Sequence, residues 1–228
     1  MENYIIASCD DIYYHQHGRE FIGSCLKNDN NCHIHVINPS SNTTNELNNY
    51  QEKHDQKFLF STEDLDINDL GYDPKIAYAI SRFFVVNAIR ERCIANQHET
   101  PAYLILDVDC IVRKKITFPK NDVGLFLRPQ ESDAMKTAAG IVYINNTTNA
   151  HNFLQSAVNV MQQIKKQWYI DQWALWLAYN HHKEIDYIQF TQKFMNWDFD
   201  DPDAPIWTGK GPRKYNDQTY LAEKNKYA

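Results

Sequence analysis

The stretch Tyr103-Leu-Ile-Leu-Asp107-Val-Asp109 runs from apolar residues straight into two carboxylates that are separated by one residue. A short apolar run of this kind is typical of a buried strand. Successive side chains on a strand point to opposite faces, so we expect Asp107 and Asp109 on one face and Val108 in the core. In open α/β sheets, ligands bind beyond the carboxyl ends of the strands. The stretch therefore predicts a strand that ends in two aspartates at a ligand site.

Two carboxylates within reach of one cation predict a divalent metal site. Hard oxygen ligands favour Mg²⁺ or Mn²⁺, which neutralise phosphate oxygens and stabilise a diphosphate leaving group. Aspartate is also a common turn residue, and on that reading the pair only begins a solvated turn after the strand. We take Asp107 and Asp109 as the predicted metal ligands.

Strand and helix patterns alternate along the rest of the chain. Apolar runs and period-two patterns predict strands at Tyr4–Ser8, His33–Ile37, Lys57–Ser61, Val123–Leu127 and Gly140–Ile144, with a further segment at Ile185–Phe190. Helical spacing predicts helices after Asp10-Asp11, around Thr43–Lys53, from Lys75 to about Asn96, near Ala150–Ile164 and at Ile170–Asn180. This alternation predicts an α/β fold with a mostly parallel sheet flanked by helices.

The size and composition of the chain limit its class. At 228 residues it is long enough for one sizeable domain, 1–228. No apolar run approaches the roughly 18 residues that span a bilayer, and Met1-Glu2-Asn3-Tyr4 lacks the basic start of a signal peptide. We therefore expect a cytoplasmic protein without a transmembrane segment.

Charge and cysteine usage exclude further classes. A formal net charge of −6 argues against nucleic acid as the main partner. The 5 cysteines are odd in number and have no CxxC spacing, which argues against a disulfide framework or a zinc knuckle and predicts reduced, mostly buried thiols. From Asp198 onward the chain is short on apolar residues.

Several motifs, in order along most of the chain, resemble family 8 glycosyltransferases and their GT-A-fold relatives. The segment Ala7-Ser8-Cys9-Asp10-Asp11-Ile12-Tyr13 is similar to the family's first strand and loop, which hold the nucleotide base and ribose. The segment Tyr78-Ala-Ile-Ser-Arg82 is similar to its tyrosine-and-arginine helix, and Asp107-Val-Asp109 to its metal motif. The resemblance implies the GT-A fold, with a nucleotide-binding half at about 1–112 and an acceptor half at about 113–228.

The resemblance also assigns residues to the donor. It implies that Ala7, Asp10 and Tyr13 lie on the base side, and that Tyr78 and Arg82 lie at the nucleotide sugar. Tyr13 and Tyr78 are equally compatible with core rings, and Arg82 with a surface position from which its stem snorkels.

Two later motifs resemble the sugar and acceptor side of the family. Ala139-Gly140-Ile141-Val142-Tyr143-Ile144-Asn145 is similar to the family's Asn-Ala-Gly-Val strand, and Asp171-Gln172 to its Asp-Gln helix motif. The resemblance makes Asp171 and Gln172, with Arg82, the candidate catalytic residues. The Asp-Gln pair is also compatible with a helix cap.

The chain departs from the family at two places. Ala138 stands where the family typically has asparagine, which removes one sugar contact. The family's late histidine, a third metal ligand, has no counterpart in Ile206-Trp207-Thr208-Gly209-Lys210-Gly211. Lys210, Arg213 and Lys214 still supply positive charge for a diphosphate, although such a cluster is often only a solvated face. With glycines at 209 and 211, we expect the segment from Trp207 to Tyr215 to close over the donor as a lid.

Together these motifs imply transfer of a sugar from a nucleotide-diphosphate donor, a UDP-sugar, to a hydroxyl acceptor on a glycan, lipid or protein, with retention. An inverting enzyme would need a carboxylate base, for which Asp198, Asp200 or Asp171 are available.

Two other classes stay open. The pattern Leu106-Asp107-Val-Asp109-Cys-Ile111 is close to the signature of haloacid-dehalogenase-like phosphohydrolases, but it lies far from the start of the chain and no acidic Gly-Asp motif follows it. A non-catalytic nucleotide- or sugar-binding module is compatible with the missing histidine and with Ala138.

Overall fold

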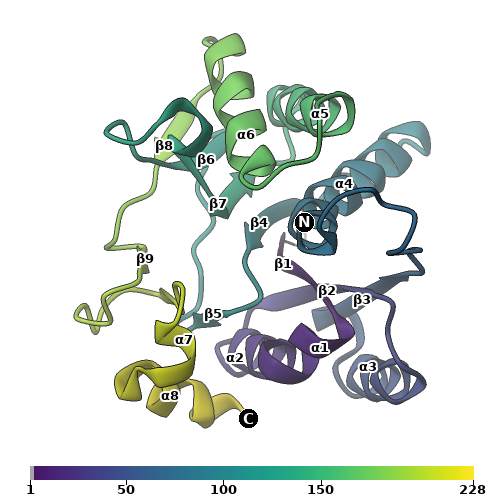
Figure 1. Cartoon of the computed structure of the whole chain (residues 1–228), viewed down its shortest axis with the longest axis vertical. Helices are drawn as coiled ribbons and strands as arrows, with labels where there is room; N and C mark the ends of the chain where they lie inside the picture. Colours follow the sequence, from purple (N-terminus) through teal and green to yellow (C-terminus); the bar gives the residue numbers. More distant parts are fainter. Residues whose placement is uncertain (1–2) are drawn as a thin grey trace. The chain divides into compact units, whose positions relative to one another are not determined.

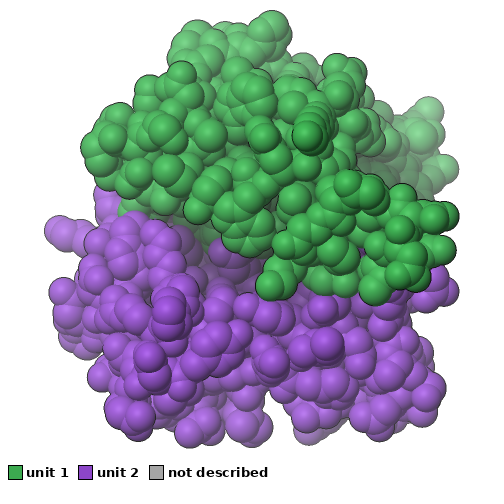
Figure 2. All heavy atoms as spheres, in the orientation of Figure 1, with its two compact units in different colours: residues 1–3, 66–105, 118–189 green, residues 4–65, 106–117, 190–228 purple. Residues whose placement is uncertain are grey.

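The computed structural model describes residues 3–228, and its elements are labelled in Figure 1. Met1 and Glu2, the first residues of the segment that argues against a signal peptide, lie outside the described residues. The described chain divides into two compact units, coloured in Figure 2. Unit 1 contains Asn3, Asp66–Ile105 and Phe118–Gln189, and unit 2 contains Tyr4–Leu65, Leu106–Thr117 and Phe190–Ala228. The prediction of one domain with halves that meet near residue 112 stays a prediction.

Unit 2 begins with parallel strands in the order β3-β2-β1. These strands are β1 (Asn3–Asp10), β2 (Asn31–Ile37) and β3 (Phe58–Glu63). A small sheet in the order β5-β10-β9 contains β5 (Cys110–Val112), β10 (Ile206–Thr208) and β9 (Met195–Asn196). The helices are α1 (Asp11–Tyr13), a π-helical turn (Tyr14–Gly18), α2 (Arg19–Lys27), α3 (Ser41–His54), α7 (Arg213–Asn216) and α8 (Gln218–Lys224), with 3-10 turns at Asp55–Lys57 and Asn225–Tyr227.

Side-chain caps start the first helices of unit 2. The Asp10 carboxylate accepts the Tyr13 backbone N–H at 2.7 Å, and the Ser40 hydroxyl accepts the Thr43 N–H at 3.2 Å. Both satisfy backbone donors that have no partner within the helix. The helical segment predicted after Asp10-Asp11 is confirmed, and Asp10 caps it. The π-helical turn that follows α1 was not predicted, and such turns are frequent at functional sites.

Unit 1 combines α4 with a second group of strands in the order β4-β7-β6-β8. Asp73 caps α4 and Pro74 occupies its first turn, where proline fits because its missing N–H needs no partner there. The elements are α4 (Pro74–Ala95), β4 (Ala102–Leu106), β6 (Val123–Leu127), a 3-10 turn (Asp133–Met135), β7 (Thr137–Ile144), α5 (Thr148–Gln163), α6 (Ile170–His181) and β8 (Tyr187–Gln189). The pairs β1–β2, β2–β3 and β6–β8 are parallel and β6–β7 is antiparallel, which confirms the predicted α/β class.

A bulge interrupts β7 beside its antiparallel neighbour β6. Leu125 pairs with Val142, whereas the next residue, Phe126, pairs with Ala138. Residues 139–141 therefore have no partner on β6, and the strand bends at that point. This bulge falls on the Ala139-Gly140 motif and releases a backbone carbonyl from the ladder.

The end of the chain is packed into unit 2. Trp207 and Tyr220 are buried with Ile111, Phe199 and Ala204 in one apolar cluster, although the chain is short on apolar residues after Asp198. Three members of the cluster are large rings, each of which buries much area. Lid closure stays a prediction, but both flanks of the segment Trp207–Tyr215 are anchored.

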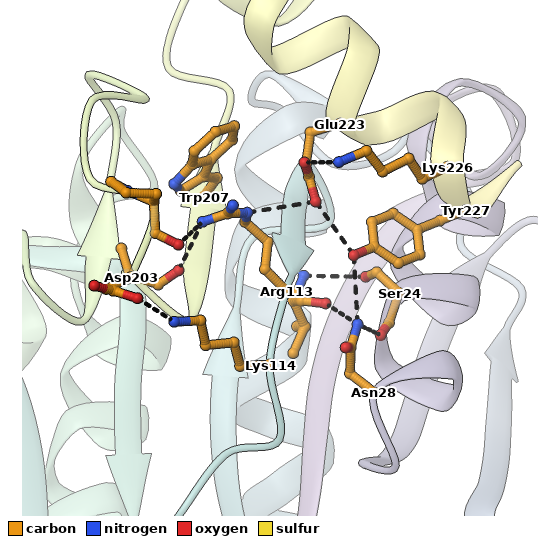
Figure 3. A network of polar contacts seen from close by, with 12 residues as sticks. Ser24, Asn28, Arg113, Lys114, Asp203, Trp207, Glu223, Lys226 and Tyr227 are labelled. Atoms are coloured by element: carbon orange, nitrogen blue, oxygen red, sulfur yellow. Dashed lines mark hydrogen bonds and ion pairs between the residues drawn. The ribbon is translucent and has the colours of Figure 1, made fainter.

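Figure 3 shows a polar network that holds this end of the chain. The Arg113 guanidinium lies 3.8 Å from the centroid of the Trp207 ring and donates to the carbonyls of Pro202 and Ala204, each at 3.1 Å. It also lies 3.4 Å from the Glu223 carboxylate. The half-buried arginine thus joins the end of β5 to β10 and α8.

The described residues bear on two expectations from the sequence, one about membrane-spanning helices and one about the cysteines. Within residues 3–228, no helix combines the length and the apolar character that crossing a membrane requires. The cysteines in that range are free thiols, buried except for the half-buried Cys93, which confirms that prediction.

Candidate functional site

The Asp107-Val-Asp109 segment is a tight turn rather than the end of a strand. β4 ends at Leu106, and the Cys110 N–H donates to the Asp107 carbonyl at 3.1 Å. Val108 and Asp109 are buried, while Asp107 is half-buried. Strand alternation therefore does not set the directions of the two carboxylates, and this part of the sequence interpretation was wrong. The physical reason is that the turn hydrogen bond replaces strand pairing after Leu106.

Two contacts from the end of the chain hold the Asp109 backbone. The Tyr220 hydroxyl donates to the Asp109 carbonyl at 2.7 Å, and the Gly209 N–H donates to the same oxygen at 3.2 Å. Burial, and then the nearby Asp109 charge, raise the pKa of Tyr220, so the phenol stays a donor. The position of Asp109 is thus fixed by β10 and α8 within unit 2.

The Lys214 ammonium forms an ion pair with the Asp109 side chain. Nζ of Lys214 donates to Oδ2 of Asp109 at 2.7 Å, and both side chains are largely buried. Burial acts to lower the pKa of Lys214, but the Asp109 carboxylate and Tyr13 raise it above its ordinary value. Lys214 is therefore a permanent positive charge at this carboxylate.

Gly209 permits this close packing. A Cβ at residue 209 would lie 2.5 Å from Cβ of Lys214 and 2.8 Å from Cζ of Tyr220. Contacts that short do not occur in folded proteins without displacement of the neighbours. The glycine of the Thr208-Gly209-Lys210 segment is thus needed for packing against α7.

Aromatic rings surround the Lys214 ammonium. Nζ lies 5.2 Å from the Tyr13 ring centroid and 5.8 Å from that of Tyr215, and the two phenol oxygens are 3.4 Å apart. Both rings also contact His17, at centroid distances of 5.2 and 5.8 Å. The arrangement gives the cation two aromatic faces in addition to its carboxylate.

His17 is a buried imidazole in the π-helical turn. It is 2% exposed, and its ring nitrogens lack hydrogen-bond partners within the described chain. Burial, followed by the charges of Lys224 and Lys214, lowers its pKa to about 3, so the ring is neutral. Sequence reasoning missed both His17 and Tyr215. The available signals were the position of Tyr215 directly after Lys214 and the four-residue spacing of His17 from Tyr13.

The other candidates in unit 2 have different surroundings. Ala7 is fully buried inside β1, and Asp10 uses its carboxylate as a helix cap. The Lys210 ammonium lies 4.0 Å from the centroid of the Trp197 ring. Arg213 donates to the Trp197 carbonyl at 2.6 Å and lies 3.2 Å from the carboxylate of Asp198, which is one of the alternative bases. Of the three basic residues of the segment, the structure thus places Lys214 on Asp109.

A second group of predicted residues meets inside unit 1. Arg82 on α4 donates from Nη2 to the Ala139 carbonyl at 3.1 Å, and the same atom lies 3.5 Å from Oδ2 of Asp171 on α6. The bulge in β7 leaves the Ala139 carbonyl off the β6 ladder, and Arg82 uses it. Arg82 is 3% exposed, so the surface alternative for this arginine was wrong.

The first turn of α6 carries Asp171 and Gln172. Oδ1 of Asp171 accepts the Gln172 N–H at 2.8 Å, and the Gln172 side chain accepts a hydrogen bond from Arg128. The residue at the N-cap position is Tyr169, in the left-handed region at φ +70°, and it makes no side-chain cap. Asp171 is therefore not the N-cap residue, although its carboxylate accepts a backbone N–H of the first turn. Sequence reasoning missed Arg128, which lies on the loop after β6.

Tyr78 lies one helical turn before Arg82 on α4. Residues four apart on a helix share a face. Tyr78 is half-buried, and its backbone carbonyl accepts the Ser81 hydroxyl at 3.0 Å. Its predicted role at the nucleotide stays a prediction.

The carboxylates fit a hard divalent cation that arrives with phosphate. Among residues 3–228, no group of three or more His, Cys, Asp or Glu side chains is arranged to hold a metal ion. At the positions where the family's late histidine would be sought, Ile206 and Trp207 are buried. Mg²⁺ is commonly held by one or two carboxylates together with substrate phosphates and water. Asp107 and Asp109 would be its protein ligands.

Comparison with solved structures identifies the fold. The chain superposes on the glycosyltransferase GlyE of Streptococcus pneumoniae with a TM-score of 0.61 over 98% of its residues, at 12% identity. It superposes on the galactosyltransferase LgtC, solved with donor and acceptor sugar analogues, with a TM-score of 0.55, at 13% identity, covering 99% of this chain and 96% of LgtC. The chain has the GT-A fold. The predicted fold is confirmed.

The GT-A fold also occurs with a different activity among the similar structures. A nucleoside-diphosphate-sugar pyrophosphorylase of Vibrio cholerae gives a TM-score of 0.52 at 10% identity, covering 96% of this chain and 99% of that protein. This chain spans 61% of the length of GlyE. No protein-family model matches the sequence, and no curated protein matches it. The comparisons therefore show the fold, and the chemistry must be inferred from the site.

Proposed function

We propose that this chain is a glycosyltransferase that moves a sugar from a UDP-sugar to a hydroxyl acceptor, with retention of the donor's anomeric configuration. The observation that carries the proposal is the Asp107–Asp109 turn with Lys214 on Asp109, in a chain with the GT-A fold. Carboxylates for a metal and a lysine for phosphate oxygens are the groups that a departing diphosphate requires. The acceptor class, a glycan, lipid or protein hydroxyl, and the cytoplasmic location remain predictions.

Residues of unit 2 would bind the nucleotide diphosphate. Asp107 and Asp109 would hold Mn²⁺ or Mg²⁺, which supplies positive charge to the diphosphate as the sugar leaves. Lys214 would contribute a second positive charge beside it. Tyr13, which follows the Asp10 cap and lies near Lys214, offers a ring face for the base.

Residues of unit 1 would act on the sugar. Asp171 and Gln172 lie on the first turn of α6, held by Arg82 and by Arg128, respectively. A carboxylate beside a buried arginine keeps one orientation, which suits it to stabilise a positively charged sugar in the transition state. Arg82 would orient Asp171.

Thermal unfolding with nucleotides tests the proposal. We expect one nucleoside diphosphate to raise the melting temperature only with Mn²⁺, because a ligand that binds the folded state alone stabilises it. Asp107→Ala and Asp109→Ala should abolish this effect. Asp203→Ala, which removes an exposed carboxylate paired with Lys114, is the matched control and should keep it. Absence of a shift with every nucleotide would contradict the proposal.

A second candidate is a nucleotide-sugar-binding protein without turnover. It is favoured by the buried Ile206 in the segment where the family has its metal-binding histidine, and by the engagement of Asp109 with Lys214. Release of UDP from the bound donor, in the presence of a panel of acceptors, distinguishes the two functions. Binding with no release over that panel would favour the second candidate.

A further inference from the structure

The Asp109–Lys214 pair places a protein cation on the carboxylate proposed to hold the metal. The two residues are 105 positions apart, and Nζ lies 2.7 Å from Oδ2. The side chains of Lys214 and Asp109 are 14% and 12% exposed, respectively, so solvent screens the pair weakly. A divalent cation that bound this oxygen would therefore stand close to the like-charged ammonium.

The backbone around the pair is fixed, whereas the lysine side chain can move. Tyr220 and Gly209 hold the Asp109 carbonyl, and Gly209 packs directly against Lys214. The lysine stem has four rotatable bonds and three equivalent donors, so its ammonium can transfer between neighbouring anions. Exchange at Asp109 therefore requires only a side-chain movement.

A metal ion alone gains little at this site. At Oδ2 of Asp109 it would compete with Lys214, and a buried charge that loses its carboxylate partner is costly. The displaced ammonium would also stay close to the like-charged metal. A diphosphate removes both penalties, because its oxygens accept from the ammonium and bind the metal at the same time.

We propose that Lys214 makes metal binding conditional on the diphosphate: it occupies Asp109 in the ligand-free protein and moves to the phosphate oxygens when metal and nucleotide enter together. The Tyr13 and Tyr215 rings, 5.2 and 5.8 Å from Nζ, keep the ammonium between the two positions. This inference rests on the proposed function, since it assumes a nucleotide-diphosphate ligand and a metal at Asp107 and Asp109.

Titration of free Mn²⁺ by electron paramagnetic resonance, with and without UDP, tests this coupling directly. For the unmodified protein we expect UDP to tighten Mn²⁺ binding about tenfold or more. For Lys214→Met we expect Mn²⁺ alone to bind roughly tenfold more tightly than to the unmodified protein. The metal then no longer competes with one charge-assisted hydrogen bond for Asp109. The further gain from UDP should then be small.

Lys27→Met is the matched control. Lys27 also lies over a tyrosine ring of unit 2, at 5.3 Å from the Tyr227 centroid, but it donates a hydrogen bond to the Lys226 carbonyl. We expect this variant to match the unmodified protein in both titrations. Lys214→Arg retains the charge and should still bind Mn²⁺ weakly without UDP.

The outcomes separate the coupling from the proposed function. If UDP and Mn²⁺ bind together but Mn²⁺ binds equally well alone, or if Lys214→Met does not change binding of Mn²⁺ alone, the coupling is overturned and the glycosyltransferase proposal stands. If no nucleoside diphosphate binds under any condition, both fail. Melting temperatures of the variants confirm that each is folded.

Discussion

At the scale of single residues, the site depends on buried charged and polar groups whose partners are distant in sequence. Lys214 on Asp109 and Arg82 near Asp171 are pairs that burial would penalise if either partner were missing. His17 is different, because its environment keeps it neutral. Each of these groups makes stability depend on its protonation state.

His17 predicts a loss of stability in acid. Its pKa is about 3 in the folded protein, while an unfolded histidine titrates near 6.5, so the unfolded state binds the proton more readily below that value. The stabilising contribution is present above pH 6.5 and falls as the pH decreases toward 3. Between pH 7 and pH 5 we expect His17 to account for about 2 kcal/mol of lost stability.

Denaturant unfolding at the two pH values measures this effect. His17→Leu should lose less stability than the unmodified protein on going from pH 7 to pH 5. The exposed His98 provides the control, and His98→Leu should leave the pH dependence unchanged. An unchanged pH dependence in His17→Leu would show that the ring is not held neutral.

At the scale of elements, β10, α7 and α8 bring the end of the chain to the Asp109 turn. The contacts are a ring cluster around Trp207, the Arg113 network and the close approach at Gly209. None of these is a local feature of helix or strand propensity. The position of Lys214 is therefore as stable as the packing of these short elements.

Gly209→Ala tests the close approach. The added Cβ would clash with Lys214 and Tyr220, so we expect a loss of about 1–3 kcal/mol, as for overpacked sites, and weaker nucleotide-dependent Mn²⁺ binding. At Gly211, with φ +58°, a Cβ meets nothing within 4 Å. Gly211→Ala should therefore cost only the backbone strain of about 1–2 kcal/mol and keep Mn²⁺ binding. Equal metal binding in both variants would contradict the role of Gly209.

Arg113→Met tests the polar network at the same end of the chain. Removing the guanidinium leaves the Pro202 and Ala204 carbonyls without this donor, and we expect a loss of about 2–3 kcal/mol and faster proteolysis after Asp198. The neighbouring Lys114 pairs with an exposed Asp203. Lys114→Met should cost under about 1 kcal/mol. Similar proteolysis rates for the two variants would argue against the network.

At the scale of the whole molecule, the GT-A fold is shared by proteins that carry out different reactions, so it limits the function without assigning it. In this chain the residues proposed for the nucleotide diphosphate lie mainly in unit 2, and those proposed for the sugar lie mainly in unit 1. A comparison of ligands therefore tests the proposed function more directly than the fold does.

Comparison of UDP with UMP measures the contribution of the second phosphate. At a concentration about 100 times its dissociation constant, a ligand adds about 2.7 kcal/mol, which for a chain of this size raises the melting temperature by about 5–10 °C. With Mn²⁺ we expect this shift for UDP and a much smaller one for UMP. The reason is that the metal and Lys214 together need oxygens from both phosphate groups. Equal shifts would mean that the nucleoside alone determines binding.

The sequence by itself determined the order and type of the main elements and the presence of two aspartates after a buried strand. These are local properties: the apolar period, the cap at Asp10 and the run from Tyr103 to Leu106 are set by neighbours in the chain. The expectation that the strand continues through the two aspartates was wrong, because a turn hydrogen bond replaces strand pairing after Leu106.

Only the tertiary structure decided which basic residue reaches Asp109, which rings surround it, and what holds Arg82. Lys210, Arg213 and Lys214 are equivalent by composition, and packing at Gly209 selects Lys214. Likewise, the carbonyl that Arg82 binds lies in the bulge of β7, where residues 139–141 have no partner on β6. Such contacts depend on chain segments far apart in sequence that pack together, and residue patterns read along the chain carry no record of that packing.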